Sequence, residues 1–113
     1  MKNVVVTSVH PYPGAVYLCS TRKAYRDKYR EFLKEEPDMH ARGVTAYTMH
    51  PELGRVFLVW AGELSSLVHE LSHVALDTFE VIGADPRECN GEPFAYLMGA
   101  LYEAAQKLDW AGK

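Results

Sequence analysis

The sequence has few cysteines and no long apolar segment. Its 113 residues include two cysteines, Cys19 and Cys89, which are too few for the disulfide framework of a small secreted domain. No segment approaches the roughly 18 apolar residues that a membrane-spanning helix requires, and the apolar run in MKNVVVTSVH is too short for a secretion signal. We therefore expect a cytoplasmic protein with reduced thiols and no membrane partner, although one disulfide is compatible with the sequence.

The sequence also lacks a surplus of basic residues. It contains 12 Lys and Arg against 15 Asp and Glu, which gives a net charge of −3, whereas nucleic-acid binders usually carry a basic surplus. The segment RKAYRDKYREFLK, residues 22–34, is locally basic. Its Asp27 and Glu31 lie three positions from basic residues, a spacing typical of ion pairs on a solvated amphipathic helix. No nucleic-acid partner is expected.

Residue patterns indicate a single α+β domain over residues 1–113. Runs rich in β-branched residues, bounded by turn residues, predict strands over 3–9, 15–20, 44–49 and 55–60. Apolar residues at helical spacing predict three helices: one from Ser20 or Thr21 to a point before Pro37, one opened by Gly62 or the residue after it, and one beginning near Asn90 as its cap. The expected fold is a short antiparallel or mixed sheet packed on three helices, in the order β-β-α-β-β-α-α.

The stretch LVHELSHV, residues 67–74, contains two histidines four residues apart in the pattern H-E-x-x-H. On a helix this spacing places His69 and His73 on one face, so that both rings can reach one zinc ion. Counting 100° per residue puts these histidines and Glu70 on the polar side of the helix, opposite its apolar stripe. Polar residues of any amphipathic helix have the same placement, so this placement alone does not distinguish a metal site from an ordinary polar face.

A catalytic zinc site usually has three protein ligands and one open position. The candidates for the third ligand are Asp77, Glu80, Asp85, Glu88, Cys89 and Glu92 downstream of the motif, and Cys19 upstream. We choose Glu92 because it lies in the first turn of the next predicted helix and points away from the apolar stripe of that helix. Two antiparallel helices would place it opposite the histidines. Its alternative role is an interaction with the positive end of its own helix.

The segments HELSH and NGEPFAY resemble the two zinc-binding helices of the gluzincin metallopeptidases. Over residues 44–108 the chain is most similar to the small members called minigluzincins and to small metallopeptidase-like proteins encoded by bacteriophages. The resemblance implies a zinc metallopeptidase with a peptide or protein substrate, with His69, His73 and Glu92 as zinc ligands. It further implies that Glu70 is the general base for a zinc-activated water.

Two positions depart from the gluzincin pattern. Gly91 splits the Asn-Glu pair of the family, and Tyr96 stands where the family often has an acidic residue, so the resemblance does not identify the residues that orient the ligands. Asp77, one turn after His73, is a candidate for that role or else a solvated carboxylate. The group that would stabilise the oxyanion is left open among Tyr47, His50, Arg87 and Tyr96. By the same resemblance an extended substrate would pair with an edge strand, for which residues 44–49 are the better candidate.

Two other interpretations are compatible with the motif. The first is a binding or regulatory protein that keeps the scaffold without catalysis, because 113 residues leave little room for a deep substrate cleft. The second is a peptide deformylase, in which an upstream cysteine is the third ligand. Cys19 lies 50 residues ahead of His69, but the chain lacks the glycine-rich and glutamine-bearing segments of that family. The sequence does not predict an oligomeric state.

Overall fold

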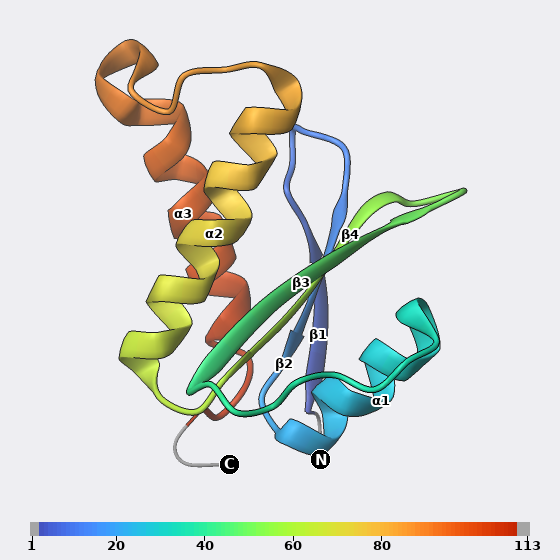
Figure 1. Cartoon of the computed structure of the whole chain (residues 1–113). Helices are drawn as coiled ribbons and strands as arrows, with labels where there is room; N and C mark the ends of the chain where they lie inside the picture. The colour runs from blue at the N-terminus through green and yellow to red at the C-terminus, as the bar shows by residue number, and fades with distance from the viewer. Residues whose placement is uncertain (1–2, 111–113) are drawn as a thin grey trace.

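The computed structural model describes residues 3–110, which form a four-stranded mixed sheet with helices on both faces (Figure 1). The strands are β1 (Val4–Ser8), β2 (Ala15–Cys19), β3 (Gly43–His50) and β4 (Gly54–Ala61). The helices are α1 (Arg22–Leu33), α2 (Leu64–Ile82) and α3 (Glu92–Ala105), with a short 3₁₀ turn, η1 (Glu88–Gly91), before α3. The predicted α+β class and the order β-β-α-β-β-α-α are confirmed.

The order of strands in the sheet is β1-β2-β4-β3, so that β4 lies inside the sheet and β3 forms one edge. β1 and β2 form the predicted antiparallel hairpin, and β3 and β4 form a second one. β2 and β4 are parallel, which requires a long connection, and this connection contains α1 and β3. Residues 44–49, predicted to lie at an edge, belong to β3 and do so.

β4 separates two hydrophobic cores, because successive side chains of a strand point to opposite faces of the sheet. Phe57 and Val59 pack in the core that contains the apolar residues of α2 and α3. Leu58 and Trp60 pack in a second core, beneath α1. The apolar run RVFLVWA therefore belongs to a strand that is buried on both faces. This arrangement places α2, which carries the H-E-x-x-H motif, on the same face as α3.

The ends of the helices follow local residue chemistry in one case and depart from it in another. Of the two predicted cap candidates, Ser20 and Thr21, it is Thr21 that caps α1, since its side chain accepts a hydrogen bond from the backbone N–H of Ala24 at 3.1 Å. The prediction that Asn90 caps the third helix is wrong. Asn90 has a φ of 58° inside η1, and Gly91, with a φ of 77°, is the residue that precedes α3. The chain turns there through left-handed conformations at Cys89, Asn90 and Gly91, of which only Gly91 is a residue that adopts them without steric cost.

Within residues 3–110, no helix combines the length and the apolar composition needed to cross a bilayer.

Candidate functional site

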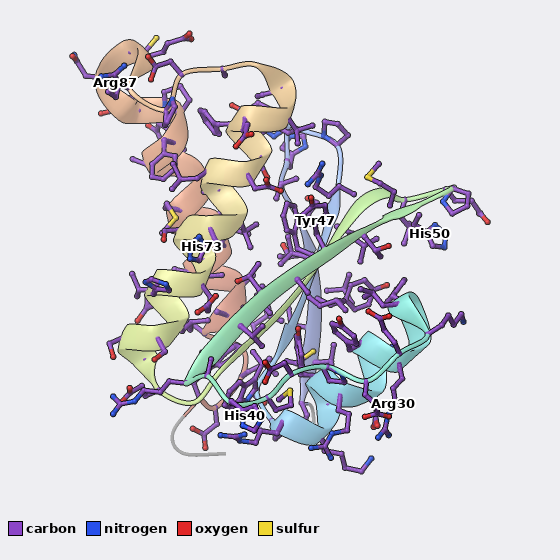
Figure 2. All side chains as sticks on the ribbon, viewed as in Figure 1. Arg30, His40, Tyr47, His50, His73 and Arg87 are labelled. Carbon is purple, nitrogen blue, oxygen red and sulfur yellow. The ribbon has the colours of Figure 1, made fainter. Side chains whose placement is uncertain are left out.

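The two histidines of the motif lie together on an exposed part of α2. Leu67, Leu71 and Val74 bury the opposite side of the helix in the core. The Nε2 atoms of His69 and His73 are 3.1 Å apart, and the ring centroids are 4.7 Å apart. In the neutral form one ring donates a hydrogen bond that the other accepts. Figure 2 shows His73 midway along α2. The predicted convergence of the two rings is therefore present.

The geometry of this pair fits a zinc ion. Two imidazole nitrogens that bind one tetrahedral zinc at about 2.0–2.1 Å are separated by roughly 3.3 Å, close to the 3.1 Å between His69 and His73. Imidazole nitrogen is also a preferred zinc donor. Between residues 3 and 110, however, no group of three or more His, Cys, Asp or Glu side chains is placed to hold a metal. The structure thus assembles two of the three predicted ligands.

Glu70 is buried, unlike the histidines beside it in the sequence. Its exposed fraction is 7%, because the edge strand β3 covers it. The Thr45 hydroxyl on β3 donates a hydrogen bond to Glu70 Oε1 at 2.8 Å. A carboxylate so deeply buried requires a hydrogen-bond donor, and Thr45 supplies one. Helical periodicity placed Glu70 on the polar side of α2 and could not show that another element covers it.

Two pockets meet at Glu70 and together form a groove between β3 and α2. One has a volume of about 410 Å³ and is lined by Thr45, Tyr47, Phe57, His73 and Asp77 in addition to Gly43 and Glu70. The other has a volume of about 400 Å³ and is lined by Arg42, Glu63, Ser66 and His69 in addition to the same Gly43 and Glu70. The groove therefore continues on both sides of the buried carboxylate, with one histidine in each half.

Glu92, the predicted third ligand, lies near the far end of α2. The helices α2 and α3 lie side by side and run in opposite directions (Figure 1). Phe94, in the first turn of α3, packs on Phe79 with ring centroids 5.7 Å apart, and Phe79 is six residues, or about 9 Å, beyond His73 along the helix axis. The structure therefore does not bring Glu92 to the histidines, and its role as a ligand stays a prediction.

Asp77 makes an ion pair instead of orienting a histidine. Arg55 Nη1 on β4 donates a hydrogen bond to Asp77 Oδ2 at 2.6 Å. The guanidinium of Arg55 also lies over the ring of Tyr47, with Cζ 4.2 Å from the ring centroid. The Arg55 and Asp77 side chains are partly buried, whereas Tyr47 is exposed, and Asp77 and Tyr47 line the half of the groove that contains His73. Neither of the two roles predicted for Asp77 included an ion pair with Arg55, because Asp77 lies on α2 and Arg55 on β4.

Of the four candidates for stabilising an oxyanion, Tyr47 is the one that lines the groove. Figure 2 shows His50 and Arg87 at distant ends of the molecule. His50 Nδ1 accepts hydrogen bonds from two backbone N–H groups of the β3–β4 turn, and Arg87 pairs with Asp85. Tyr96, on α3, is 76% exposed.

The remaining ligand candidates lie away from the motif. Cys19, which the deformylase interpretation requires, is fully buried in the core beneath α1, on the opposite face of the sheet. Burial raises the pKa of the Cys19 thiol to about 12, which disfavours the thiolate that a metal would need. The candidates after the motif, Glu80, Asp85, Glu88 and Cys89, lie in the last turn of α2 or beyond it.

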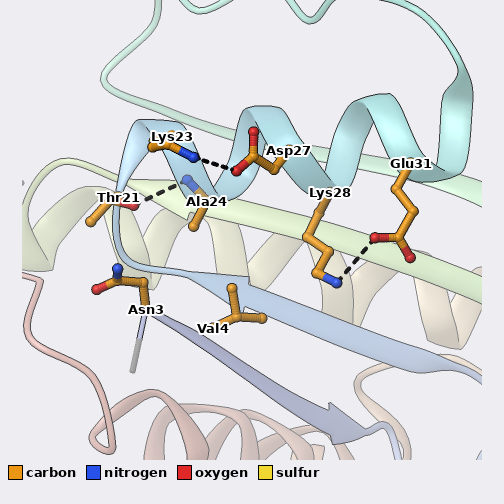
Figure 3. A pocket seen from close by; sticks show the side chains of 8 residues that line it. All are labelled: Asn3, Val4, Thr21, Lys23, Ala24, Asp27, Lys28 and Glu31. Atoms are coloured by element: carbon orange, nitrogen blue, oxygen red, sulfur yellow. Dashed lines mark hydrogen bonds and ion pairs between the residues drawn. The ribbon is translucent and has the colours of Figure 1, made fainter. Parts of the chain in front are cut away.

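A further pocket lies between α1 and the start of β1 (Figure 3). Its volume of about 520 Å³ exceeds that of either half of the groove, but its charged side chains already have partners. Lys23 pairs with Asp27 at 2.9 Å, and Lys28 pairs with Glu31 at 3.2 Å. The latter is one of the pairs predicted for this helix. We therefore place the candidate functional site at the groove, where the buried carboxylate and the histidines lie.

No model of a protein family, no curated protein and no solved structure matches the chain. Sequence reasoning missed Thr45 and Gly43, which surround the carboxylate of Glu70, and no local signal marks either residue, because both contacts join segments about 25 residues apart in the chain.

Proposed function

We propose that this chain is a zinc-dependent metallopeptidase in which His69 and His73 hold the ion and Glu70 is the general base. The observation that supports the proposal most directly is the position of the Glu70 carboxylate, which is buried at the junction of two pockets with one converging histidine in each. Glu92 remains the proposed third ligand, as the resemblance to gluzincins implies. The proposed location in the cytoplasm is supported by Cys19 and Cys89, which are both free.

The chemistry divides between the ion and the protein. A bound zinc ion lowers the pKa of a coordinated water to about 7 and polarises a carbonyl group. In the proposed mechanism Glu70 accepts the proton of the attacking water and returns it to the leaving amine. Tyr47 is the proposed donor to the oxyanion, because it lines the same half of the groove as His73.

The proposed substrate is a peptide segment in an extended conformation. β3 is an edge strand whose outer backbone groups can pair with an added strand. The groove continues on both sides of Glu70, so a peptide that follows β3 can extend in both directions from the reacting bond. Cleavage of internal peptide bonds is therefore proposed over removal of a single terminal residue.

The substitution Glu70→Gln tests this function. It keeps the size of the side chain and removes the base, so we expect zinc content to stay at about one per chain while hydrolysis of a peptide library falls by at least 100-fold. The matched control is Glu80→Gln, an exposed residue in the last turn of α2, which should leave both measurements unchanged. Equal activity of wild type and Glu70→Gln would rule out Glu70 as the base.

A second candidate function is a binding or regulatory protein that keeps the zincin scaffold without turnover. It is favoured by the incomplete ligand set within residues 3–110. Purified protein that binds zinc and peptides but cleaves no peptide of a broad library would support it. In such a protein a bound peptide segment would still contact β3 and the half of the groove that Tyr47 lines.

A further inference from the structure

We infer that Thr45 is a positioning residue that holds Glu70 in place for proton transfer, an assignment that rests on the proposed function. Its Oγ1 donates a hydrogen bond to Glu70 Oε1 at 2.8 Å and also lies 3.3 Å from the backbone carbonyl oxygen of Glu70. A hydroxyl has a single hydrogen, and the shorter contact, to the carboxylate, is the stronger bond. The contact joins the edge strand to the motif helix.

Gly43 supplies the space that the carboxylate occupies. A Cβ atom at position 43 would lie 3.1 Å from both Cγ and Oε2 of Glu70, closer than most real Cβ contacts. Gly43 also borders both pockets of the groove. Oε1 is therefore anchored by Thr45, while Oε2 lies beside Gly43 where the two pockets meet.

This division between the two oxygens matches what a general base requires. A base must lie within hydrogen-bond reach of the proton that it accepts, and a free glutamate side chain samples several rotamers. The bond from Thr45 limits these rotamers and leaves the second oxygen open to the groove. Thr45 lines the groove, but the role inferred for its hydroxyl is exerted through Glu70.

The test replaces the hydroxyl with a methyl group in Thr45→Val. We expect kcat to fall by about 10- to 100-fold, with KM and zinc affinity unchanged, and Thr45→Ser to restore most of the loss. Thr48→Val is the matched control, because Thr48 lies on the same strand with its side chain on the opposite face, and it should keep the wild-type kcat. If the role of Thr45 were only structural, Thr45→Val would not lower kcat while leaving KM unchanged.

Gly43→Ala provides a second variant should Thr45→Val fail to fold. Its Cβ atom should displace the end of Glu70 and lower kcat without changing zinc affinity. Independently of turnover, Thr45→Val should lower the urea midpoint in the wild-type background and lower it less in a Glu70→Leu background, because the hydroxyl there keeps only its longer contact to the backbone carbonyl.

The outcomes separate the two proposals. An active wild type whose Thr45→Val variant keeps full kcat overturns the positioning role alone, as does an unchanged urea midpoint in the wild-type background. A wild type that neither binds zinc nor hydrolyses any peptide overturns the proposed function and the role of Thr45 with it.

Discussion

Glu70 and the histidines on either side of it illustrate how different the environments of close neighbours on one helix can be. His69 and His73 are exposed, while Glu70 is 7% exposed. At about 100° per residue, Glu70 lies about 100° around the helix from His69 and about 60° from His73, on the side of α2 over which β3 crosses. Because β3 covers one side of the Glu70 carboxylate, a substrate can approach it only from the groove. The proposed role of Glu70 as a base needs such an approach.

The two cysteines should differ sharply in reactivity. Cys19 is fully buried, and its pKa is raised to about 12, chiefly by burial, whereas Cys89 is exposed. At neutral pH we expect a thiol reagent such as DTNB to modify one thiol rapidly in the folded protein and two after denaturation. Cys89→Ser should remove the rapid reaction, and rapid modification of Cys19 in the native protein would contradict the burial described here.

At the scale of elements, the length of α2 decides where α3 begins. α2 continues to Ile82, nine residues past His73, and the turn through η1 then returns the chain to Glu92. Three successive residues of this turn, from Cys89 to Gly91, have positive φ values. A shorter α2 would have brought the start of α3 closer to the histidines. The separation of Glu92 from the motif is thus a property of this connection.

Zinc affinity of Glu92→Ala tests whether α3 contributes the third ligand. If it does, the affinity should fall by at least about tenfold, since a lost ligand costs no less than a lost ligand-orienting group. Glu103→Ala, an exposed residue of α3, is the control and should bind zinc normally. Full retention of affinity in Glu92→Ala would direct attention to Asp77, which lines the same pocket as His73.

At the scale of the whole molecule, the groove depends on the way the sheet holds β3 beside α2. Both elements pack on β4, which is buried on both faces. The fold rests on two hydrophobic cores, and the exposed histidines contribute little to either. We therefore expect the domain to fold without zinc and to gain stability from it, in contrast to zinc fingers that unfold without metal.

Thermal unfolding with and without zinc tests this expectation. A ligand that binds the native state alone stabilises it by about 2.7 kcal/mol at a concentration 100-fold above its Kd. We expect added zinc to raise the Tm by several degrees, and a chelator to reverse the increase. His69→Ala should abolish the effect, whereas His40→Ala, an exposed loop residue (Figure 2), should not. No shift with the wild type would exclude a native zinc site of useful affinity.

Features that depend on the periodicity of a helix or strand, or on turn residues, could be predicted from the sequence. The order of elements, a helix cap at Ser20 or Thr21, the edge position of residues 44–49 and the convergence of His69 and His73 were all predicted and are all present. Each follows from helix or strand periodicity, from turn chemistry or from the order of neighbouring elements.

The tertiary structure alone decided which distant residues meet. It buried Glu70 under β3, paired its carboxylate with Thr45, joined Asp77 to Arg55 and placed Glu92 near the far end of α2. These contacts depend on the register of the sheet and on the lengths of the connections, which no local pattern specifies. The H-E-x-x-H spacing by itself determined that two imidazoles converge, because helix geometry is the same everywhere. The surroundings of Glu70, on which its proposed role as a base depends, were determined by packing.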